Sequence, residues 1–466
     1  MFRGSQNSAR MCDGLTRREW LRAGGIGLGG LTLPALLQSH ARAAKSQHRA
    51  SAKSVIVLFN AGGMPQHESW DPKPDGPTAT RGDLGAIATR TPGLYVGELM
   101  PKTAQLTDRI AVIRAMVTGD NAHSTSGYQM LTGMPHAPLS RENAAPGKPN
   151  DWPSLNALVQ ALRAPRGGLP PSISLPRLLA NNGGQNPWPG TDSGFLGRRH
   201  DPWFLVCDPS QPDFQAPGSD LPDDLSQRRL DGRVSLLKQF RNYADDLEQQ
   251  ASVQNYDRYR QQAINLIAGG KARTAFDMGA EPTKVRDRYG RTKQGQSMLL
   301  ARRLVEAGVS LVQVNWANYD KSKPNSGSWD THTKHTESLK GWLLPVMDQA
   351  YSALLDDLEE RGLLDETLVC WVAEFGHTPR INARAGRDHW GRVFSIALAG
   401  GGIRGGVVHG ETDRNAAGPL RDVVRPCDYL ATVFHCLGFE ADTLVYDMEN
   451  RPIPISRGSV VNPILA

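Results

Sequence analysis

Short apolar runs that alternate with longer amphipathic segments dominate the hydrophobic pattern of this chain. The first run, residues 54–59, ends at Asn60-Ala-Gly-Gly63, which is typical of a buried parallel strand that stops at a tight glycine turn. Residues 338–361 place apolar side chains on one stripe with acids opposite, and Gly362 then supplies a stop signal for this helix. Further apolar runs lie at residues 110–113, 309–314, 368–373 and 393–399. Strands that alternate with helices predict an α/β fold whose mostly parallel sheet carries helices on both faces.

Two regions interrupt this alternation. Residues 135–224 are rich in Pro, Gly, Asn and Asp, and we expect a long ordered excursion over the surface. Residues 225–267 are polar with helically spaced apolar positions, which predicts a helical insertion or lid with a solvated charged face. We therefore expect residues 44–466 to form a single α/β domain with one helical insertion.

The amino-terminal segment has the pattern of an export signal. Residues 16–22 contain the paired arginines Arg17 and Arg18, and a weakly apolar, glycine-rich run and the small-residue site Ala41-Arg42-Ala43 follow. The apolar run falls short of the ~20 residues that a membrane-spanning helix needs. We expect residues 1–43 to be a twin-arginine signal peptide, so that the translocase is an export partner. The mature protein would then be periplasmic or secreted, with membrane contact only through this segment.

Removing the predicted signal changes what the charge balance implies. The chain has a net charge of +6, and residues 1–43 hold six arginines against two acidic residues, which is four of those six charges. The remainder is nearly neutral, so the basic composition gives no support for nucleic acid or an anionic membrane as a partner. Cys207, Cys370, Cys427 and Cys436 form no CxxC pair, which argues against a zinc-thiolate site. One disulfide between two of the last three is compatible with export.

Acidic and imidazole side chains gather in the carboxyl-terminal third of the chain. Asp330 and His332 are two positions apart, Glu374 follows an apolar strand, and His389 lies in a Gly-Arg-Asp-His-Trp-Gly loop. Such ligands without thiolates suit a divalent ion: Zn, Mn or Fe, or Mg or Ca where fewer imidazoles take part. Taken singly, each residue also fits a structural role, such as a helix cap at Asp330 or an ion pair between Glu374 and Arg380. Their placement at strand ends favours the metal.

Two earlier segments supply further candidates. Glu68 lies in the block that directly follows the first strand, where α/β proteins place their sites, and it is a candidate ligand. His123, Ser124 and Ser126 follow the second strand and open a helix, where a hydroxyl could act as a nucleophile at the positive helix end. The alternative for each serine is an ordinary helix cap.

These blocks, in this order, resemble an uncharacterised exported family, domain of unknown function 1501, within the alkaline-phosphatase-like (sulfatase-like) superfamily. The resemblance spans roughly residues 54–440 and is specific only when the blocks are taken together. The matching blocks are Gly62-Gly63 with Glu68-Ser-Trp-Asp-Pro-Lys-Pro74, Tyr128-Gln-Met-Leu-Thr-Gly133, Gly295 to Gly308, Trp329-Asp-Thr-His332, and Glu374-Phe-Gly with Gly386-Arg-Asp-His-Trp390.

The resemblance implies an alkaline-phosphatase-like fold in which Asp and His hold metals that activate a hydroxyl nucleophile and stabilise a phosphoryl or sulfuryl group in transfer. Asp330, His332 and His389 match one metal set. Glu374 stands where the superfamily usually has an Asp.

Three departures from the superfamily pattern change the expected chemistry. Asn60 ends the first strand where a metal-binding Asp is common, so Glu68 would substitute for it. The usual nucleophile position falls on His123, and Ser124 and Ser126 are out of register. The formylglycine signature Cys-x-Pro-x-Arg is missing, because its nearest match, Cys207-Asp-Pro-Ser-Gln211, fails at the last residue.

Together these observations predict an exported metal-dependent hydrolase of phosphate or sulfate esters that does not use formylglycine. Asp330, His332, His389, Glu374 and Glu68 would hold one or two divalent ions, and Zn, Mn, Mg and Ca are not distinguished. Arg380 or Arg387 would balance the charge of a small anionic ester, which includes sulfated or phosphorylated carbohydrates. One alternative is a non-catalytic protein that binds a metal or ligand on the same fold. Another is a different metal-dependent reaction on a carbohydrate or other small anion.

Overall fold

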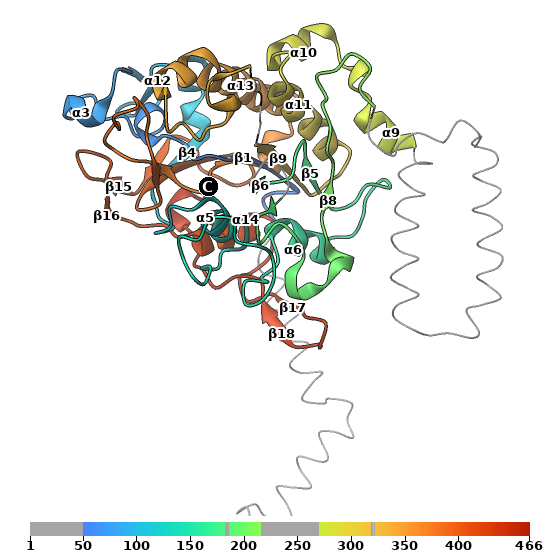
Figure 1. The fold of residues 1–466 in the computed structure, drawn as a ribbon. Coiled ribbons are helices and arrows are strands. Elements are labelled where there is room, and N and C mark those ends of the chain that lie inside the picture. The colour runs from blue at the N-terminus through green and yellow to red at the C-terminus, as the bar shows by residue number, and fades with distance from the viewer. Residues whose placement is uncertain (1–49, 182–185, 216–269, 318–319, 321) are drawn as a thin grey trace, which may run out of the picture. The chain divides into compact units, whose positions relative to one another are not determined.

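An eight-stranded sheet forms the centre of the computed structural model, which describes residues 50–181, 186–215, 270–317, 320 and 322–466 (Figure 1). The strands lie in the order β14, β4, β13, β10, β1, β9, β5, β8. Their bounds are β1 (Ser54–Asn60), β4 (Ile110–Met116), β5 (Ser172–Leu175), β8 (Trp203–Phe204), β9 (Leu311–Trp316), β10 (Thr367–Val372), β13 (Phe394–Ala399) and β14 (Val407–His409). Seven of these strands run in one direction and β13 opposes both its neighbours, which confirms the predicted mostly parallel sheet.

Strand β1 shows why the apolar runs are continuous rather than alternating. All seven of its residues are buried, and it pairs in parallel with β10 on one side and β9 on the other. Val55, Val57 and Phe59 belong to one hydrophobic core, whereas Ile56 and Leu58 belong to a second core on the opposite face. A strand covered on both faces needs apolar side chains at every position.

Helices cover both faces of the sheet (Figure 1). The core around Ile56 receives side chains from α11 and α13, and the core around Val57 receives them from α5, α6 and α14. The helix bounds are α3 (Thr78–Arg81), α4 (Pro101–Ala104), α5 (His123–Thr132), α6 (Leu155–Leu162), α9 (Gly270–Phe276), α10 (Thr283–Tyr289), α11 (Lys293–Glu306), α12 (His335–Ser338), α13 (Leu344–Glu360) and α14 (Pro426–Cys436). The helical stretch predicted at 338–361 begins in α12, passes through a π-helical turn at Leu339–Leu343 and ends with α13, just before Gly362.

The expectation of a surface excursion at residues 135–224 is wrong for its described part. Strand β5 is fully buried inside the sheet between β9 and β8, and α6 buries Leu155, Leu158 and Val159 against one face. These elements are only four and eight residues long, so the surrounding Pro and Gly positions hide their apolar pattern. The predicted signal at 1–43 and the predicted insertion at 225–267 lie outside the described residues.

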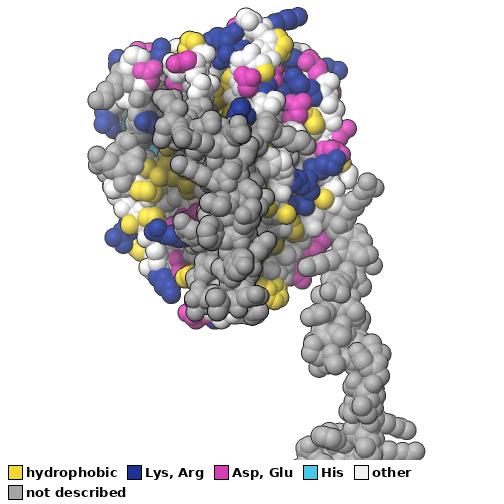
Figure 2. All heavy atoms as spheres, turned by 90° about the vertical axis from the view of Figure 1, so that its right-hand side faces the viewer, with side chains coloured by type: hydrophobic (Ala, Val, Ile, Leu, Met, Phe, Trp, Pro, Cys, Tyr) yellow, Lys and Arg dark blue, Asp and Glu magenta, His cyan; other side chains and the backbone are white. Residues whose placement is uncertain are grey.

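The remaining described strands form two-stranded ribbons that are separate from the central sheet. These are β2 (Ala86–Ala88) with β3 (Tyr95–Gly97), β6 (Ala180–Asn181) with β7 (Asn186–Pro187), β11 (Gly376–His377) with β12 (His389–Trp390), β15 (Glu411–Thr412) with β16 (Pro419–Arg421), and β17 (Leu444–Tyr446) with β18 (Pro452–Pro454). None of the described helices is long and apolar enough to cross a membrane. Cys207, Cys370, Cys427 and Cys436 are free thiols, so the structure does not form the disulfide considered from the sequence. Basic and acidic side chains are interspersed on the described part of the face in Figure 2.

Candidate metal centre

Five segments meet at one edge of the sheet and build a polar cluster there. Strands β1, β4, β9 and β10 share a direction, so their carboxyl ends open at the same edge. Gly62 follows β1, His123 begins α5 after β4, Asp330 follows β9, and Glu374 follows β10. His389 lies in β12, just before β13, whose opposite direction places its amino end at this edge. Open α/β sheets commonly carry their sites at this edge.

Three imidazoles converge on the carboxylate of Asp330. Its Oδ1 lies 2.9 Å from His332 Nε2 and 3.0 Å from His389 Nε2. Its Oδ2 lies 3.3 Å from His123 Nε2. All three histidines therefore present the same ring atom, Nε2, to one point, although they come from different segments.

The second nitrogen of each ring, Nδ1, faces an oxygen that can only accept a hydrogen bond. These oxygens are Glu374 Oε1 at 2.8 Å from His123, Asp388 Oδ1 at 2.7 Å from His332, and the Asn121 carbonyl at 2.8 Å from His389. Because carboxylate and carbonyl oxygens accept, each Nδ1 carries a proton and each neutral ring keeps its lone pair on Nε2. Outer oxygens commonly fix the tautomer and orientation of metal-bound histidines in this way.

Lone pairs on three nitrogens and a carboxylate cannot face one another unless positive charge lies between them. Three protons could supply it, but the ring centroids of His123 and His332 lie only 4.3 Å and 4.6 Å from that of His389. Three charged rings at such spacing repel one another. One divalent cation held by Asp330, His332 and His389 would supply that charge, and imidazole with carboxylate suits Zn, Mn or Fe. Asp330, His332 and His389 offer ligand atoms within 4.8 Å of one another, which fits a metal at this place.

The same contacts shift the pKa values of the cluster in the metal-free chain. Burial raises the pKa of Asp330, but hydrogen bonds from the three imidazoles outweigh it and hold that pKa far below its usual range. Burial lowers the pKa of His123, but the hydrogen bonds to Asp330 and Glu374 outweigh it and raise that pKa to about 10. Contact with Asp330 likewise raises the pKa of His332. Protons therefore occupy the cluster without metal, and a binding cation must displace them.

Glu374 connects this cluster to the end of β1. It is fully buried, and its Oε1 accepts hydrogen bonds from the backbone N–H of Gly62 at 2.7 Å and from His123 Nδ1 at 2.8 Å. Gly62 has a φ of +115°, and a Cβ there would collide with the backbone nitrogen of Asp330. Only glycine therefore lets β1 pass this close to Asp330. Oε2 of Glu374 is buried and has no hydrogen-bond partner among the described residues.

The structure does not place Glu68 among the groups around Asp330, which corrects the expectation that it replaces the missing first-strand Asp. Its Oε1 accepts from Arg387 Nη2 at 2.6 Å and Nε at 3.0 Å, and its Oε2 lies 3.3 Å from His335 Nε2. Arg387 is fully buried and also donates to the carbonyls of Thr378 and Thr80. The expected substrate-binding role of Arg387 is therefore also corrected, because its guanidinium is already occupied inside the protein.

The serines next to His123 are held by the backbone. Ser124 Oγ donates to the Arg141 carbonyl at 2.9 Å, and Ser126 Oγ donates to the Glu374 carbonyl at 2.6 Å. Both serines are fully buried, so neither hydroxyl is presented as the nucleophile considered from the sequence. Arg380 is exposed, and its part in substrate binding stays a prediction.

Sequence reasoning missed the oxygens that orient the histidines. Asp388 precedes His389 in the same loop, and its acidic character was a usable signal. Asn121 acts through its backbone carbonyl, which no side-chain pattern reveals. Asn60, at the end of β1, donates to the Val372 carbonyl at 3.3 Å and so ties β1 to β10.

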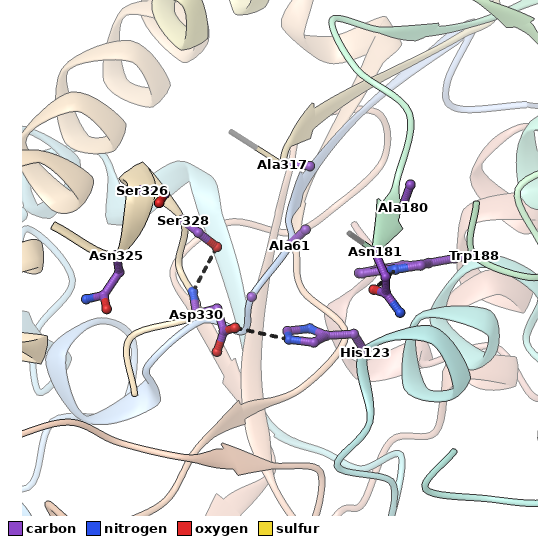
Figure 3. Close-up of a pocket in the computed structure, with 11 residues that line it drawn as sticks. Ala61, His123, Ala180, Asn181, Trp188, Ala317, Asn325, Ser326, Ser328 and Asp330 are labelled. Atoms are coloured by element: carbon purple, nitrogen blue, oxygen red, sulfur yellow. Dashed lines mark hydrogen bonds and ion pairs between the residues drawn. The ribbon is translucent and has the colours of Figure 1, made fainter. Parts of the chain in front are cut away.

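A pocket of about 170 Å³ opens beside the cluster (Figure 3). His123 and Asp330 form one end of it. The ring of His123 is stacked on Trp188, with centroids 6.0 Å apart and an interplanar angle of 21°. The described residues that line the pocket are Ala61, Gly62, His123, Ala180, Asn181, Trp188, Ala317, Asn325, Ser326, Ser328 and Asp330.

The chain belongs to the family described as "Protein of unknown function (DUF1501)", whose model matches residues 52–465, and the resemblance seen in the sequence is thereby confirmed. The search of the curated proteins finds no match. Similar solved structures include the PsFucS1 sulfatase from Pseudoalteromonas sp., with 13% identity, a TM-score of 0.40, and 92% of this chain and 74% of that chain covered. The phosphonate monoester hydrolase SpPMH from Silicibacter pomeroyi has 12% identity, a TM-score of 0.40, and 89% and 76% covered. The lipoteichoic acid synthase LtaP from Listeria monocytogenes has 8% identity, a TM-score of 0.33, and 85% and 77% covered.

Proposed function

We propose that this member of the DUF1501 family is a metal-dependent hydrolase of phosphate or sulfate esters that does not use formylglycine. One observation carries the proposal: three Nε2 atoms and the Asp330 carboxylate converge, while each Nδ1 is held by an acceptor. That arrangement requires a positive charge at its centre. Asp330, His332 and His389 would hold the ion, with His123 next to them. When bound, a divalent ion supplies Lewis-acid polarisation of an ester oxygen and lowers the pKa of a water molecule.

His123 takes the place of a hydroxyl nucleophile, and in this proposal a water molecule attacks instead. Glu374 accepts the Nδ1 hydrogen of His123, whose ring lines the pocket, and in this proposal Nε2 of that ring acts as the proton acceptor. The water oxygen bonds to phosphorus or sulfur, and the bond from that atom to the ester oxygen breaks. The proton that His123 Nε2 accepts passes to the departing alcohol. The substrate would be a small anionic ester, and no covalent ester forms on the protein.

A second candidate function is metal or ligand binding without turnover. Two observations favour it: the hydroxyls of Ser124 and Ser126 are bound to backbone carbonyls, and the described pocket lining contains no Lys or Arg. Such a protein would keep the ion at Asp330 but would lack a group that activates the nucleophile. Turnover measurements distinguish this function from hydrolysis.

Metal analysis combined with an ester screen tests the proposal. The purified chain should hold a divalent ion and hydrolyse at least one ester from a set of phosphate monoesters, phosphate diesters and sulfate esters. Asp330→Asn and His389→Ala should lose the ion, whereas His409→Ala, a half-buried histidine on the edge strand β14, should keep it. His123→Gln should slow turnover about 100-fold or more, the usual scale for a lost general base.

The possible results distinguish hydrolysis from metal binding without turnover. A wild-type chain that binds no divalent ion overturns both the hydrolase and the metal-binding candidate. A chain that binds the ion but hydrolyses none of the esters supports binding without turnover. Full hydrolysis by His123→Gln would remove His123 from the mechanism while leaving the metal centre intact.

We also propose that residues 1–43 direct the protein through the twin-arginine translocase to the periplasm or beyond. The paired Arg17 and Arg18 carry this proposal. The double variant Arg17→Lys/Arg18→Lys should accumulate in the cytoplasm, whereas Arg22→Lys should be exported like the wild type. Fractionation that finds the double variant outside the cytoplasm would refute this route.

A further inference from the structure

The pocket beside the metal centre has walls whose chemistry restricts what it can bind (Figure 3). Asn181 and Trp188 stand on one side, and the loop with Asn325, Ser326 and Ser328 stands on the other. The ends of β1 and β9 contribute the small residues Ala61, Gly62 and Ala317.

Charge is confined to the metal end of this pocket. Within the described lining, only His123 and Asp330 ionise, and both belong to the metal cluster. The remaining lining residues are uncharged, so a second anionic group in the ligand would lose its hydration without gaining a counter-charge. The part of a ligand that extends away from the metal is therefore uncharged.

Asn181 offers hydrogen-bond donors in a fixed direction. Its Oδ1 accepts from Trp188 Nε1 at 2.7 Å, and because the indole N–H can only donate, the amide cannot be flipped. The Nδ2 group is therefore left to donate elsewhere. Trp188 itself is held in place, since it is 3% exposed and packs against Phe59 and His123. Trp188 therefore contributes mainly by orienting the Asn181 amide, because little of its own ring is exposed for contact with a ligand.

The opposite wall adds hydroxyl groups on a loop that is held by side-chain hydrogen bonds. Ser328 Oγ accepts the backbone N–H of Asp330 at 3.1 Å, which leaves its own hydrogen to donate. Ser326 has a φ of 54° and Asn325 a φ of 49°, a strained conformation for residues other than glycine. The Asn325 side chain holds this conformation, because its Nδ2 donates at 2.7 Å to both the Thr333 carbonyl and Ser338 Oγ.

We propose that this pocket binds one uncharged sugar ring, so that the ester cleaved at the metal centre is a sugar phosphate or sugar sulfate. The proposal deepens the hydrolase function above and rests on it. Neutral donors at Asn181, Ser326 and Ser328 match the oxygens of sugar hydroxyls, and Ala61 and Ala317 offer small apolar surface to ring C–H groups. The cavity volume of about 170 Å³ is close to the ~150 Å³ that holds one benzene-sized ring, so it suits a single ring better than a chain of rings.

A comparison of two esters tests this inference. We expect the wild type to prefer hexose 6-phosphate or hexose 6-sulfate over the matching 4-nitrophenyl ester in kcat/KM. Asn181→Ala should raise KM for the sugar ester about tenfold, the effect of one lost hydrogen bond, and change the nitrophenyl ester less than twofold. The control Asn186→Ala removes the exposed β7 partner of Asn181, which does not line the pocket, and should leave both esters unchanged. Metal content should be the same in all three proteins.

A binding measurement separates failure of this inference from failure of the hydrolase function. Titration calorimetry of wild type and Asn181→Ala with free glucose and galactose should show weaker binding in the variant, whether or not the protein hydrolyses anything. Ester hydrolysis without a sugar preference, and without sugar binding, would overturn the inference but leave the hydrolase standing. Sugar binding without any hydrolysis would overturn the hydrolase function but leave the sugar-binding pocket standing. Equal effects of Asn181→Ala on both esters would also overturn the specificity role.

Discussion

Replacing Glu68 with glutamine should weaken the fold strongly and leave the metal centre occupied. Glu68 is 3% exposed and Arg387 is fully buried, and they form a charged pair with contacts of 2.6 Å and 3.0 Å. Glutamine keeps the size of the side chain and removes its charge. The Arg387 guanidinium would then be a buried charge without a partner of opposite sign, which is the costly state.

The magnitude follows from the remaining contacts of Arg387. Removing one partner of a buried pair typically costs about 3–5 kcal/mol. Arg387 would keep its hydrogen bonds to the carbonyls of Thr378 and Thr80, both at 2.9 Å, so we expect a loss near 3 kcal/mol in the free energy of unfolding. Burial raises the pKa of Glu68, but Arg387 outweighs it and lowers that pKa. The stabilisation is therefore present above the ordinary glutamate pKa of ~4.3 and is lost as the pH falls below it.

Urea denaturation followed by both fluorescence and circular dichroism measures this loss. The control is Glu366→Gln, which breaks a surface pair with Lys53 whose side chains are 45% and 65% exposed. That change should cost less than about 1 kcal/mol. Metal content of Glu68→Gln should equal that of the wild type, since Glu68 is paired with Arg387 and not with the histidines around Asp330. The difference between Glu68→Gln and the wild type should shrink as the pH is lowered through 4.

Two outcomes would refute this reasoning. A Glu68→Gln variant as stable as Glu366→Gln would mean that the buried pair does not stabilise the fold. A Glu68→Gln variant of normal stability that has lost its metal would restore Glu68 as the ligand that the sequence had indicated.

Three further predictions concern the centre and the thiols. The metal-free chain should lose stability as the pH rises from 6.5 to about 10. The reason is that protonated His123 stabilises the fold fully below its unfolded pKa of ~6.5 and loses its proton near its raised pKa of about 10. Thermal melts with a chelator should show this decrease in stability, and melts with metal should not. Gly62→Ala should lower both melting temperature and metal content, since its Cβ would collide with the Asp330 backbone, and a normal metal content would contradict the close approach. A thiol reagent should modify half-buried Cys427 well before fully buried Cys370, as mass spectrometry of labelled peptides can show.

The sheet was largely predictable because burial on both faces leaves a local trace. The runs at 54–59 and 368–373 are continuously apolar, and each became a central strand. Strand β5 could not be predicted in the same way. It has only four residues, two of them serines, and it is buried because β9 and β8 pair on either side of it. Pairing with distant strands leaves no periodic pattern inside so short a segment.

The meeting of polar residues around Asp330 could be predicted from the sequence, but the pairing of Glu68 with Arg387 could not. Parallel strands bring their carboxyl ends together, so residues that follow strands, such as Asp330 and Glu374, are expected to meet. Glu68 also follows a strand and carries the same chemical signal. Its actual partner, Arg387, lies 319 residues further along the chain. Only the three-dimensional packing decides which carboxylate meets the histidines and which is neutralised by an arginine.

The hydrogen bond at His389 bears on how many ions this cluster could hold at once. His389 belongs to both groups of three potential ligands, one with Asp330 and His332 and one with His123 and Glu142. Its Nδ1 is already bound to the Asn121 carbonyl, so its single free nitrogen can serve only one of these groups at a time.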